Sequence, residues 1–382
     1  MIIVQYYHPL EMLPPGISLI RMLKDMGENV AYVGVHYADD TERVLKELNV
    51  PYMLYQRWPV VRFRDHPFWR LWFVLTKFYR RGRLCRLLQH LFLLRAYKRF
   101  SKRVGAGEVV VWSVNKQIAE LFGPGLVELG KRHVLWLTEY GEKIGEYANA
   151  VLIESEINRA RLLQKDLSLK ELPFVLPNKP YKHPRRRNLP VADPLVEKNV
   201  RMWKDKTVFL YQGSLGNDRR GIVDMIEWIC EEFPDCVMAV MSPWSPIVES
   251  ISSRHENFSY VPFVAPPHHL EVTSRATIGL AVYTADQVAG ISPLNGLYCA
   301  PNKTFEYTGF GIPLLCNNPP GLVDSVGKAG AAVCLPELSR EQVLEGAREL
   351  MTNYEDYTAR AKVFFESVDM EKIVRQILSA AH

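Results

Sequence analysis

The chain has 382 residues, of which 48% are hydrophobic and 23% charged, and it carries a formal net charge of +5. This length exceeds that of one ordinary domain and favours two. The composition is typical of a soluble globular enzyme, and no uncharged apolar stretch is long enough to predict a membrane span.

The cysteines and the N-terminal sequence bear on the cellular compartment. The six cysteines stand singly, and no two of them form a Cys-x-x-Cys pair. We therefore expect reduced packing residues in a cytosolic protein. The opening sequence MIIVQYYHPL has no basic leader before its hydrophobic run, which favours a first strand over a signal peptide.

The first elements along the chain predict a βαβ unit. A strand over 2–7 leads into a loop at 14–16, then a helix over 17–26 and a strand over 30–35. Such a unit implies a parallel sheet with a ligand edge at the carboxyl ends of its strands. Further strands are predicted over 108–114, 133–138 and 150–155.

Residues 57–103 form a basic and aromatic segment. It contains fourteen Lys or Arg residues against one acid, Asp65, with Trp, Phe and Leu interleaved. This pattern favours a surface that lies against anionic lipid. A solvated helix whose apolar side packs in the core explains the pattern equally well. Nucleic acid is a weaker interpretation, because acids balance bases over the rest of the chain.

A stretch rich in Pro and Arg, 176–194, has no apolar periodicity and is the best candidate for a linker. After it, strands and helices alternate from 207 to 335, which predicts a doubly wound α/β domain. Long amphipathic helices follow from 340 to the end of the chain. The predicted division is 1–178 for an N-terminal domain, 179–200 for the linker, 201–360 for a C-terminal domain and 361–382 for a last helix that returns to the N-terminal domain.

The sequence YQGSLGNDRRG, 211–221, runs from a strand through glycines into a helix. Glycines such as Gly213 allow close backbone approach, and a helix N-terminus offers N–H groups and a positive end to a phosphate. Arg220, just before the helix, adds a charged fork. A plain glycine turn with exposed arginines accounts for the same residues.

The sequence APNKTFEYTGFGIP, 300–313, places a cation and a carboxylate in the first turns of a helix. The helix macrodipole disfavours Lys303 at this end unless an anion binds there. Glu306 lies three residues further on roughly the same face, where it can accept hydrogen bonds from two vicinal hydroxyls of a ribose. Without further context, an exposed Lys–Glu pair on a surface helix explains the stretch too.

These motifs together resemble a known family. From about 207 to 335 the chain looks like the donor-binding domain of GT-B glycosyltransferases of the "glycosyl transferases group 1" type, and 301–313 is similar to that family's Pro-Asn-Lys-x-x-Glu-Tyr-x-x-x-Gly-x-Pro signature. The resemblance implies an α/β fold with two Rossmann-like doubly wound domains, donor and acceptor, that face a central cleft. It implies that Glu306 holds the ribose and that Arg220 meets the diphosphate.

Two departures from the family pattern concern the sugar and the diphosphate. Tyr298 stands where many relatives carry a second Glu, and Ser214 stands where an Arg is frequent. Sugar contacts are therefore expected from elsewhere, such as Asn295 or backbone amides, and the diphosphate charge is expected to fall on Arg220 and Lys303. The expected donor-binding residues are Gly16, Gly213, Ser214, Arg220, Phe263, Asn295, Asn302, Lys303 and Glu306.

Other candidate residues are open to two interpretations. Phe263 and Trp244 follow neighbouring strands and suit packing on a nucleobase, or ordinary loop packing. Glu139, after the strand at 133–138, suits a general base on an acceptor hydroxyl, or a helix cap. His268 and His269 begin a predicted helix away from the cleft edge, with no third ligand, so we expect no metal and no cofactor.

The resemblance implies a glycosyltransferase of the hexosyltransferase type. It would move a sugar from a UDP or GDP sugar to a hydroxyl of a glycan or lipid-linked glycan in polysaccharide biosynthesis. We expect a cytoplasmic location, peripheral on the inner face of the cell membrane if 57–103 binds lipid, and no nucleic-acid partner. Two other functions stay open: a UDP-sugar 2-epimerase, although no His and acid cluster is found, and a non-catalytic GT-B-like partner subunit.

Overall fold

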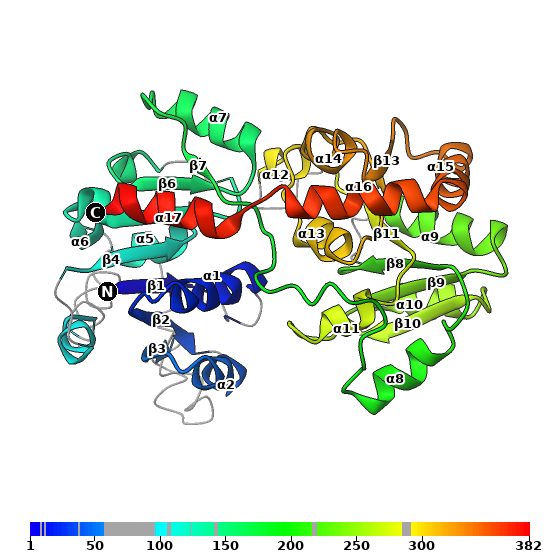
Figure 1. The fold of residues 1–382 in the computed structure, drawn as a ribbon, viewed down its shortest axis with the longest axis horizontal. Helices are drawn as coiled ribbons and strands as arrows, with labels where there is room; N and C mark the ends of the chain where they lie inside the picture. The colour runs from blue at the N-terminus through cyan, green and yellow to red at the C-terminus, as the bar shows by residue number, and fades with distance from the viewer. Residues whose placement is uncertain are drawn as a thin grey trace, which may run out of the picture. The chain divides into compact units, whose positions relative to one another are not determined.

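The computed structural model describes residues 1–7, 10, 13–36, 39–56, 95, 97–104, 108–122, 124–140, 144–215, 220–284 and 292–382. The chain divides into two compact units (Figure 1). Unit 1 comprises 1–154, 163–174 and 374–382, and unit 2 comprises 155–162 and 175–373.

Unit 1 is built on a parallel sheet. Within the described residues the sheet has seven strands in the order β3-β2-β1-β4-β5-β6-β7. All neighbouring strands from β3 to β6 in this order pair in parallel. Its central strands are fully buried because apolar residues occupy both faces, as parallel sheets covered by helices require. The strands of this unit are β1 (Ile2–Tyr6), β2 (Val30–His36), β3 (Tyr52–Gln56), β4 (Val110–Val114), β5 (His133–Leu137), β6 (Val151–Glu154) and β7 (Phe174–Val175).

The helices that accompany this sheet are α1 (Pro14–Asp25), α2 (Asp39–Glu47), α5 (Lys116–Phe122), α6 (Pro124–Val127), α7 (Ile157–Asp166) and α17 (Met370–Ala381), with short 3₁₀ helices η3 (Gly130–Arg132) and η4 (Gly145–Tyr147). Helices α7 and α17 each contribute residues to both units, because the unit boundaries fall within them.

Unit 2 has a second parallel sheet, with six strands among the described residues in the order β10-β9-β8-β11-β12-β13. Alternate residues of β8 enter two separate hydrophobic cores: Val208 and Leu210 pack on one face, and Phe209 and Tyr211 on the other. The strand order reverses between β8 and β11, and open α/β sheets bind ligands at the carboxyl ends of the strands at such a switch point.

The strands of unit 2 are β8 (Val208–Gln212), β9 (Val237–Ser242), β10 (Phe258–Pro262), β11 (Ile278–Ala281), β12 (Leu314–Asn317) and β13 (Ala332–Leu335). Its helices are α8 (Pro194–Arg201), α9 (Arg220–Glu232), α10 (Pro246–Ser252), α11 (His269–Thr273), α12 (Leu294–Leu297), α13 (Asn302–Gly309), α14 (Pro320–Leu322), the π-helical turn η5 (Val323–Gly327), α15 (Arg340–Thr352) and α16 (Tyr354–Glu366).

Several details differ from the sequence-based expectations. The predicted loop at 14–16 is the first turn of α1, because Pro14 takes the first helical position, where its missing N–H costs nothing. Strands β3 and β7 had not been predicted. Residues 179–200, predicted as a linker, fall in unit 2, where Arg187 donates to the Ser274 carbonyl at 2.9 Å. Most of the basic and aromatic segment 57–103 lies outside the described residues.

Two features of the described ranges bear on membrane spans and on disulfides. No helix there has the length and apolar character to cross a membrane. The cysteines within those ranges, Cys230, Cys236, Cys299, Cys316 and Cys334, are all free thiols.

Candidate functional site

The candidate site lies in unit 2 at the switch point of its sheet. Lys303, in the first turn of α13, reaches the carboxyl ends of the two strands that flank this point. Its Nζ lies 4.5 Å from the ring centre of Tyr211 at the end of β8 and 5.2 Å from that of Tyr283 just after β11. Both rings offer a face to the cation, which helps to hold a largely buried ammonium in place.

Gly213, directly after β8, brings the backbone close to this ammonium. Its φ of +152° is one that L side chains rarely adopt, and a Cβ built there would lie 3.3 Å from Lys303 Nζ. The next residue, Ser214, is exposed, and its carbonyl accepts from the Tyr211 hydroxyl at 3.3 Å. The backbone conformation and the nearby Lys303 therefore favour glycine where β8 ends.

Glu306 lies one turn beyond Lys303 in α13 and is only 4% exposed. Its Oε1 accepts a hydrogen bond from His269 Nε2 at 3.0 Å, and its Oε2 accepts from the side-chain amide of Gln212. A buried carboxylate needs such charge-assisted donors, because an unpaired one is costly to desolvate. Since a carboxylate is acceptor-only, His269 must carry its proton on Nε2.

The amide of Gln212 is itself oriented. Thr273 in α11 donates from Oγ1 to Gln212 Oε1 at 2.8 Å, which directs the amide N–H toward Glu306. Two elements, the end of β8 and helix α11, therefore fix the Glu306 carboxylate from two sides.

His183, from the segment that precedes α8, holds the backbone of the same helix. Its Nε2 lies 3.1 Å from the Glu306 carbonyl oxygen, and its Nδ1 accepts from the Arg185 N–H at 3.1 Å. The second bond places the proton on Nε2, which then donates to the carbonyl. Burial lowers the pKa of His183 to about 4, so the imidazole is neutral near pH 7.

Tyr307 anchors α13 to the sheet. Its hydroxyl donates to the Leu210 carbonyl at 2.7 Å, and its ring lies over Gly279 of β11, where a Cβ would come within 2.5 Å of the ring. The helix therefore packs directly across β8 and β11, and this packing sets the positions of Lys303 and Glu306.

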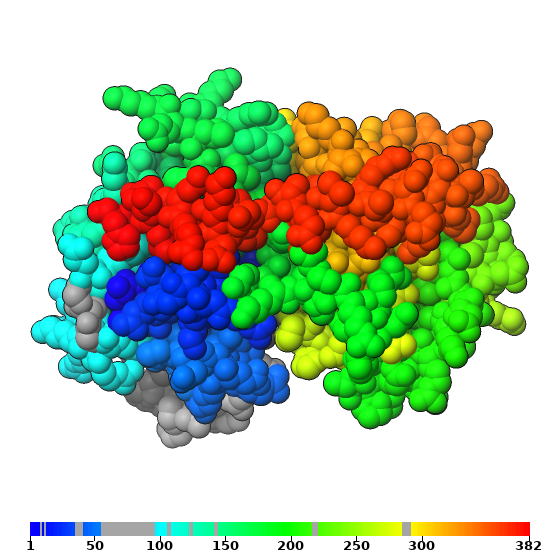
Figure 2. Space-filling view, viewed as in Figure 1, coloured from blue at the N-terminus to red at the C-terminus, as the bar shows by residue number. Residues whose placement is uncertain are grey.

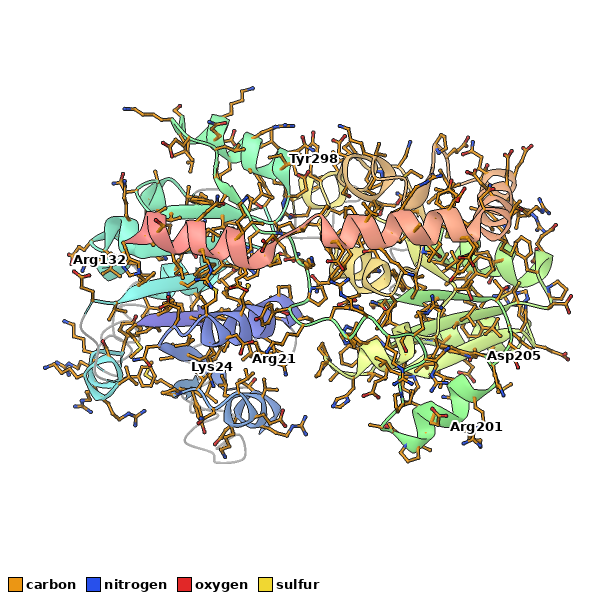
Figure 3. All side chains as sticks on the ribbon, viewed as in Figure 1. Arg21, Lys24, Arg132, Arg201, Asp205 and Tyr298 are labelled. Atoms are coloured by element: carbon orange, nitrogen blue, oxygen red, sulfur yellow. The ribbon has the colours of Figure 1, made fainter. Side chains whose placement is uncertain are left out.

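Other predicted donor residues belong to helices of unit 2. Asn302 is the first residue of α13, and Arg220 is the first residue of α9, with a side chain outside the described ones. Asn295, in α12, accepts a hydrogen bond at Oδ1 from Arg159 Nη1 at 3.0 Å. Tyr298 is the C-cap of α12 (Figure 3).

Two aromatic side chains are exposed at the carboxyl edge of the same sheet. Phe263 follows β10 and is 59% exposed, and Trp244 follows β9 and is 63% exposed. Because Pro262 of β10 pairs with Ser242 of β9, the two aromatic residues leave the sheet at adjacent points. Large exposed rings at a ligand edge are suited to stacking on a planar group.

The remaining predicted residues lie in unit 1. Gly16 is buried in the first turn of α1, where a Cβ would lie 2.6 Å from Leu13 Cδ2. Glu139 follows β5 and is exposed. Burial raises the pKa of Tyr6 to about 12, and the charge of Glu139 contributes to this shift. Glu139 thus lies just beyond a central strand of the sheet, whereas Gly16 lies in the helix that follows β1.

The structure corrects one interpretation and adds residues that sequence reasoning missed. His269, expected away from the site, contacts Glu306 directly. Gln212, Thr273, His183 and Arg159 were also missed, because their partners are distant in sequence. Within the described ranges, no group of three or more His, Cys, Asp or Glu residues is arranged to hold a metal ion.

Two units with parallel sheets, each reversing its strand order after the first three strands, form the two-domain α/β architecture of GT-B glycosyltransferases, as the sequence predicted. The chain matches no protein-family model. No curated protein matches it either.

Solved structures with this architecture align over nearly the whole chain. Anabaena Alr3699/HepE in complex with UDP and glucose has a TM-score of 0.65 and 10% identity, covering 99% of this chain and 98% of its own. A Rickettsia africae glycosyltransferase has a TM-score of 0.63 and 10% identity, with coverages of 100% and 97%. A Listeria monocytogenes protein assigned as a UDP-N-acetylglucosamine 2-epimerase has a TM-score of 0.60 and 12% identity, with coverages of 99% and 95%. At these identities, the likeness establishes the fold.

Proposed function

We propose that this protein is a glycosyltransferase that moves a sugar from a nucleoside diphosphate sugar to a hydroxyl group of an acceptor. The observation that carries the proposal is the position of Lys303 and Glu306: a cation and a fixed carboxylate one helical turn apart, at the switch point of the unit 2 sheet. Support also comes from the solved structures of similar fold, since Alr3699/HepE was crystallised with UDP and glucose.

In this proposal the diphosphate binds at Lys303 and the N-terminus of α13. The backbone at Gly213 and the side chain of Arg220 complete the anion site, with Ser214 and Asn302 beside it. Preorganised positive groups of this kind stabilise the charge that develops on a departing nucleoside diphosphate. They also resolve the conflict of a lysine at a helix N-terminus, because a bound anion offsets the unfavourable dipole interaction.

Glu306 would hold the ribose. Each carboxylate oxygen has two acceptor positions, and the bonds from His269 and Gln212 use one on each oxygen. Both oxygens therefore retain capacity for one ribose hydroxyl each. The nucleobase would stack on Phe263, beside Trp244, because both rings are exposed at the same sheet edge.

The sugar and the acceptor involve further residues. Asn295 would contact the sugar through its amide N–H₂, because its Oδ1 already accepts from Arg159. In unit 1, Glu139 would act as general base on the acceptor hydroxyl, and Gly16 would approach the donor phosphate. The reaction in this proposal needs no metal and no cofactor.

The finer points of the proposal concern the acceptor. We propose a glycan or lipid-linked glycan in polysaccharide biosynthesis, and a cytoplasmic protein bound at the inner face of the cell membrane. The basic and aromatic composition of 57–103 supports this, since such segments favour anionic lipid surfaces. Charge reversal of Arg80, Arg81 and Arg83 to Glu is expected to weaken binding to anionic vesicles.

Incubation of the protein with radiolabelled UDP, GDP and dTDP sugars, in the absence of an acceptor, tests the activity. A transferase is expected to release free sugar and nucleoside diphosphate slowly, and Glu306→Ala should abolish the release. Glu345→Ala, an exposed glutamate in α15, is the matched control and should behave as wild type. An isomerised nucleotide sugar would instead favour an epimerase, which the Listeria neighbour makes a relevant alternative. No product from any donor would contradict both enzymes.

A further inference from the structure

Helix α8 (Pro194–Arg201) covers the edge strand of the unit 2 sheet. Its inner side buries Val196 and Val200, followed by Trp203 just beyond the helix, in the core beneath β10. The indole of Trp203 donates to Ser259 Oγ at 2.9 Å. Covering an edge strand in this way protects its unpaired backbone groups, which accounts for the inner face of the helix.

The outer face of α8 has no such structural role. Leu195 and Met202 are 75% and 71% exposed, the highest values for large hydrophobic side chains among the described residues. They are seven residues apart, which is two helical turns, so they lie on the same side of the helix. Lys198 and Arg201 lie on that side as well and are exposed. Single exposed apolar residues are common on protein surfaces. Two on one face, with bases between them, form a patch that suits an interaction surface.

The surface carries a net positive charge, with four exposed bases (Lys198, Arg201, Lys204, Lys206) against three acids (Asp193, Glu197, Asp205), of which Asp205 is exposed between two of the lysines. Lys204 and Lys206 are exposed and continue the basic series beyond the helix. Asp193 is committed to capping the helix, since its carboxylate accepts from the Leu195 N–H at 2.8 Å. Glu197, on the flank of the helix, is bonded to Arg275 Nη2 at 3.1 Å. Figure 3 labels Arg201 and Asp205 at the end of this region.

We infer that the outer face of α8, defined here by Leu195, Lys198, Arg201, Met202, Lys204 and Lys206, docks on an anionic lipid surface. Apolar side chains enter the boundary between headgroups and acyl chains, while Lys and Arg extend to the phosphate groups. This face has both components in alternation, and the charge complementarity favours anionic lipid. Figure 2 shows that the region around α8 (green) reaches the surface of unit 2. The inference does not depend on the proposed enzymatic activity.

The orientation of α8 gives the docking a functional consequence. Asn199 donates to the Tyr260 carbonyl at 3.3 Å and Trp203 donates to Ser259, so the helix runs opposite to β10. Leu195 is therefore directed toward the carboxyl end of β10, the end at which Phe263 is exposed. Lipid docking through α8 would hold the ligand edge of unit 2 near the membrane surface.

Co-sedimentation of the full chain with vesicles tests the inference. The vesicles contain either phosphatidylcholine alone or equal parts of phosphatidylcholine and phosphatidylglycerol. The test variant is Lys198→Glu with Met202→Ser, and the matched control is Lys362→Glu with Val363→Ser, an exposed base and an exposed apolar residue of α16. All four positions are exposed, so folding should be retained, and thermal unfolding verifies it.

The wild type is expected to bind the anionic vesicles and not the neutral ones. The α8 variant should bind them about tenfold more weakly or worse, whereas the control variant should stay within about twofold of wild type. Binding through 57–103 would contribute equally to wild type and to both variants, so a tenfold loss in the α8 variant alone would mean that α8 supplies most of the binding. Equal binding by wild type and the α8 variant, or no binding by wild type, would overturn the inference. Lipid-free self-association that the α8 variant loses would also overturn it, by assigning the face to a second copy of the chain.

Discussion

Replacing His269 by Leu tests how the Glu306 carboxylate is held. The substitution removes the Nε2–H donor that lies 3.0 Å from Glu306 Oε1, but it leaves a carboxylate that is 4% exposed. A hydrogen bond to a charged group contributes about 1.5–3 kcal/mol, and a buried site is at the upper end of this range. We therefore expect helix α13 to lose about 2–3 kcal/mol of local stability.

A double-mutant cycle with Glu306→Leu separates this bond from other effects of the substitution. Each single variant leaves one polar partner buried without its bond, whereas the double variant removes both partners. The double variant should thus cost less than the sum of the singles, with a coupling energy of about 1–2 kcal/mol. Native-state hydrogen exchange of peptides that span 300–313 measures the opening free energy of α13 directly, so unit 1 does not complicate it.

Additivity would refute this reasoning. If the two single changes add to within about 0.5 kcal/mol, His269 and Glu306 do not stabilise one another. Gln212→Leu provides a second cycle with the same expectation, because Gln212 donates to the other oxygen of the carboxylate.

Three further predictions concern the packing of unit 2. Burial holds the pKa of His183 near 4, against about 6.5 in the unfolded chain. The neutral imidazole therefore contributes about 3 kcal/mol to the free energy of unfolding above pH 6.5, and this contribution is lost as pH falls toward 4. His183→Gln should flatten the pH dependence of stability in urea titrations, and an unchanged pH profile would contradict this. Gly321→Ala would place a Cβ 2.5 Å from the Cys299 carbonyl oxygen and should cost about 1–3 kcal/mol, measured by thermal unfolding; an unchanged midpoint would show that this contact relaxes freely. Tyr307→Phe removes the hydroxyl bonded to the Leu210 carbonyl and should cost about 1 kcal/mol in the same assay, whereas a gain would contradict this role.

Local sequence patterns predicted the elements well where periodicity or a motif was strong. The motif at 301–313 predicted a helix that carries Lys303 and Glu306, and the structure has α13 over Asn302–Gly309. The alternation of strands and helices after 207 predicted a doubly wound α/β domain, which the unit 2 sheet confirms, and the resemblance of 301–313 to the family signature implied the GT-B fold. Both follow from spacings of a few residues, which a single sequence contains in full.

The partners of these residues could not be predicted in the same way. Glu306 meets His269 across 37 positions and Gln212 across 94, and such pairs depend on strand order rather than on local spacing. Arg159 reaches Asn295 across 136 positions, because residues 155–162 belong to unit 2 although they precede the last strand of the unit 1 sheet. The expectation that His269 lies away from the site was therefore wrong, because the strand order of the sheet brings α11 and α13 together.

Calorimetric titration of UDP, GDP, CDP and ADP into wild type, Glu306→Ala and Glu345→Ala tests the central claim most directly. The account predicts that at least one nucleotide binds wild type and the Glu345 variant equally. Glu306→Ala should weaken that binding about tenfold, which corresponds to about 1.4 kcal/mol. If no nucleotide binds at millimolar concentration, or if Glu306→Ala binds as tightly as wild type, the switch point of unit 2 is not a nucleotide site.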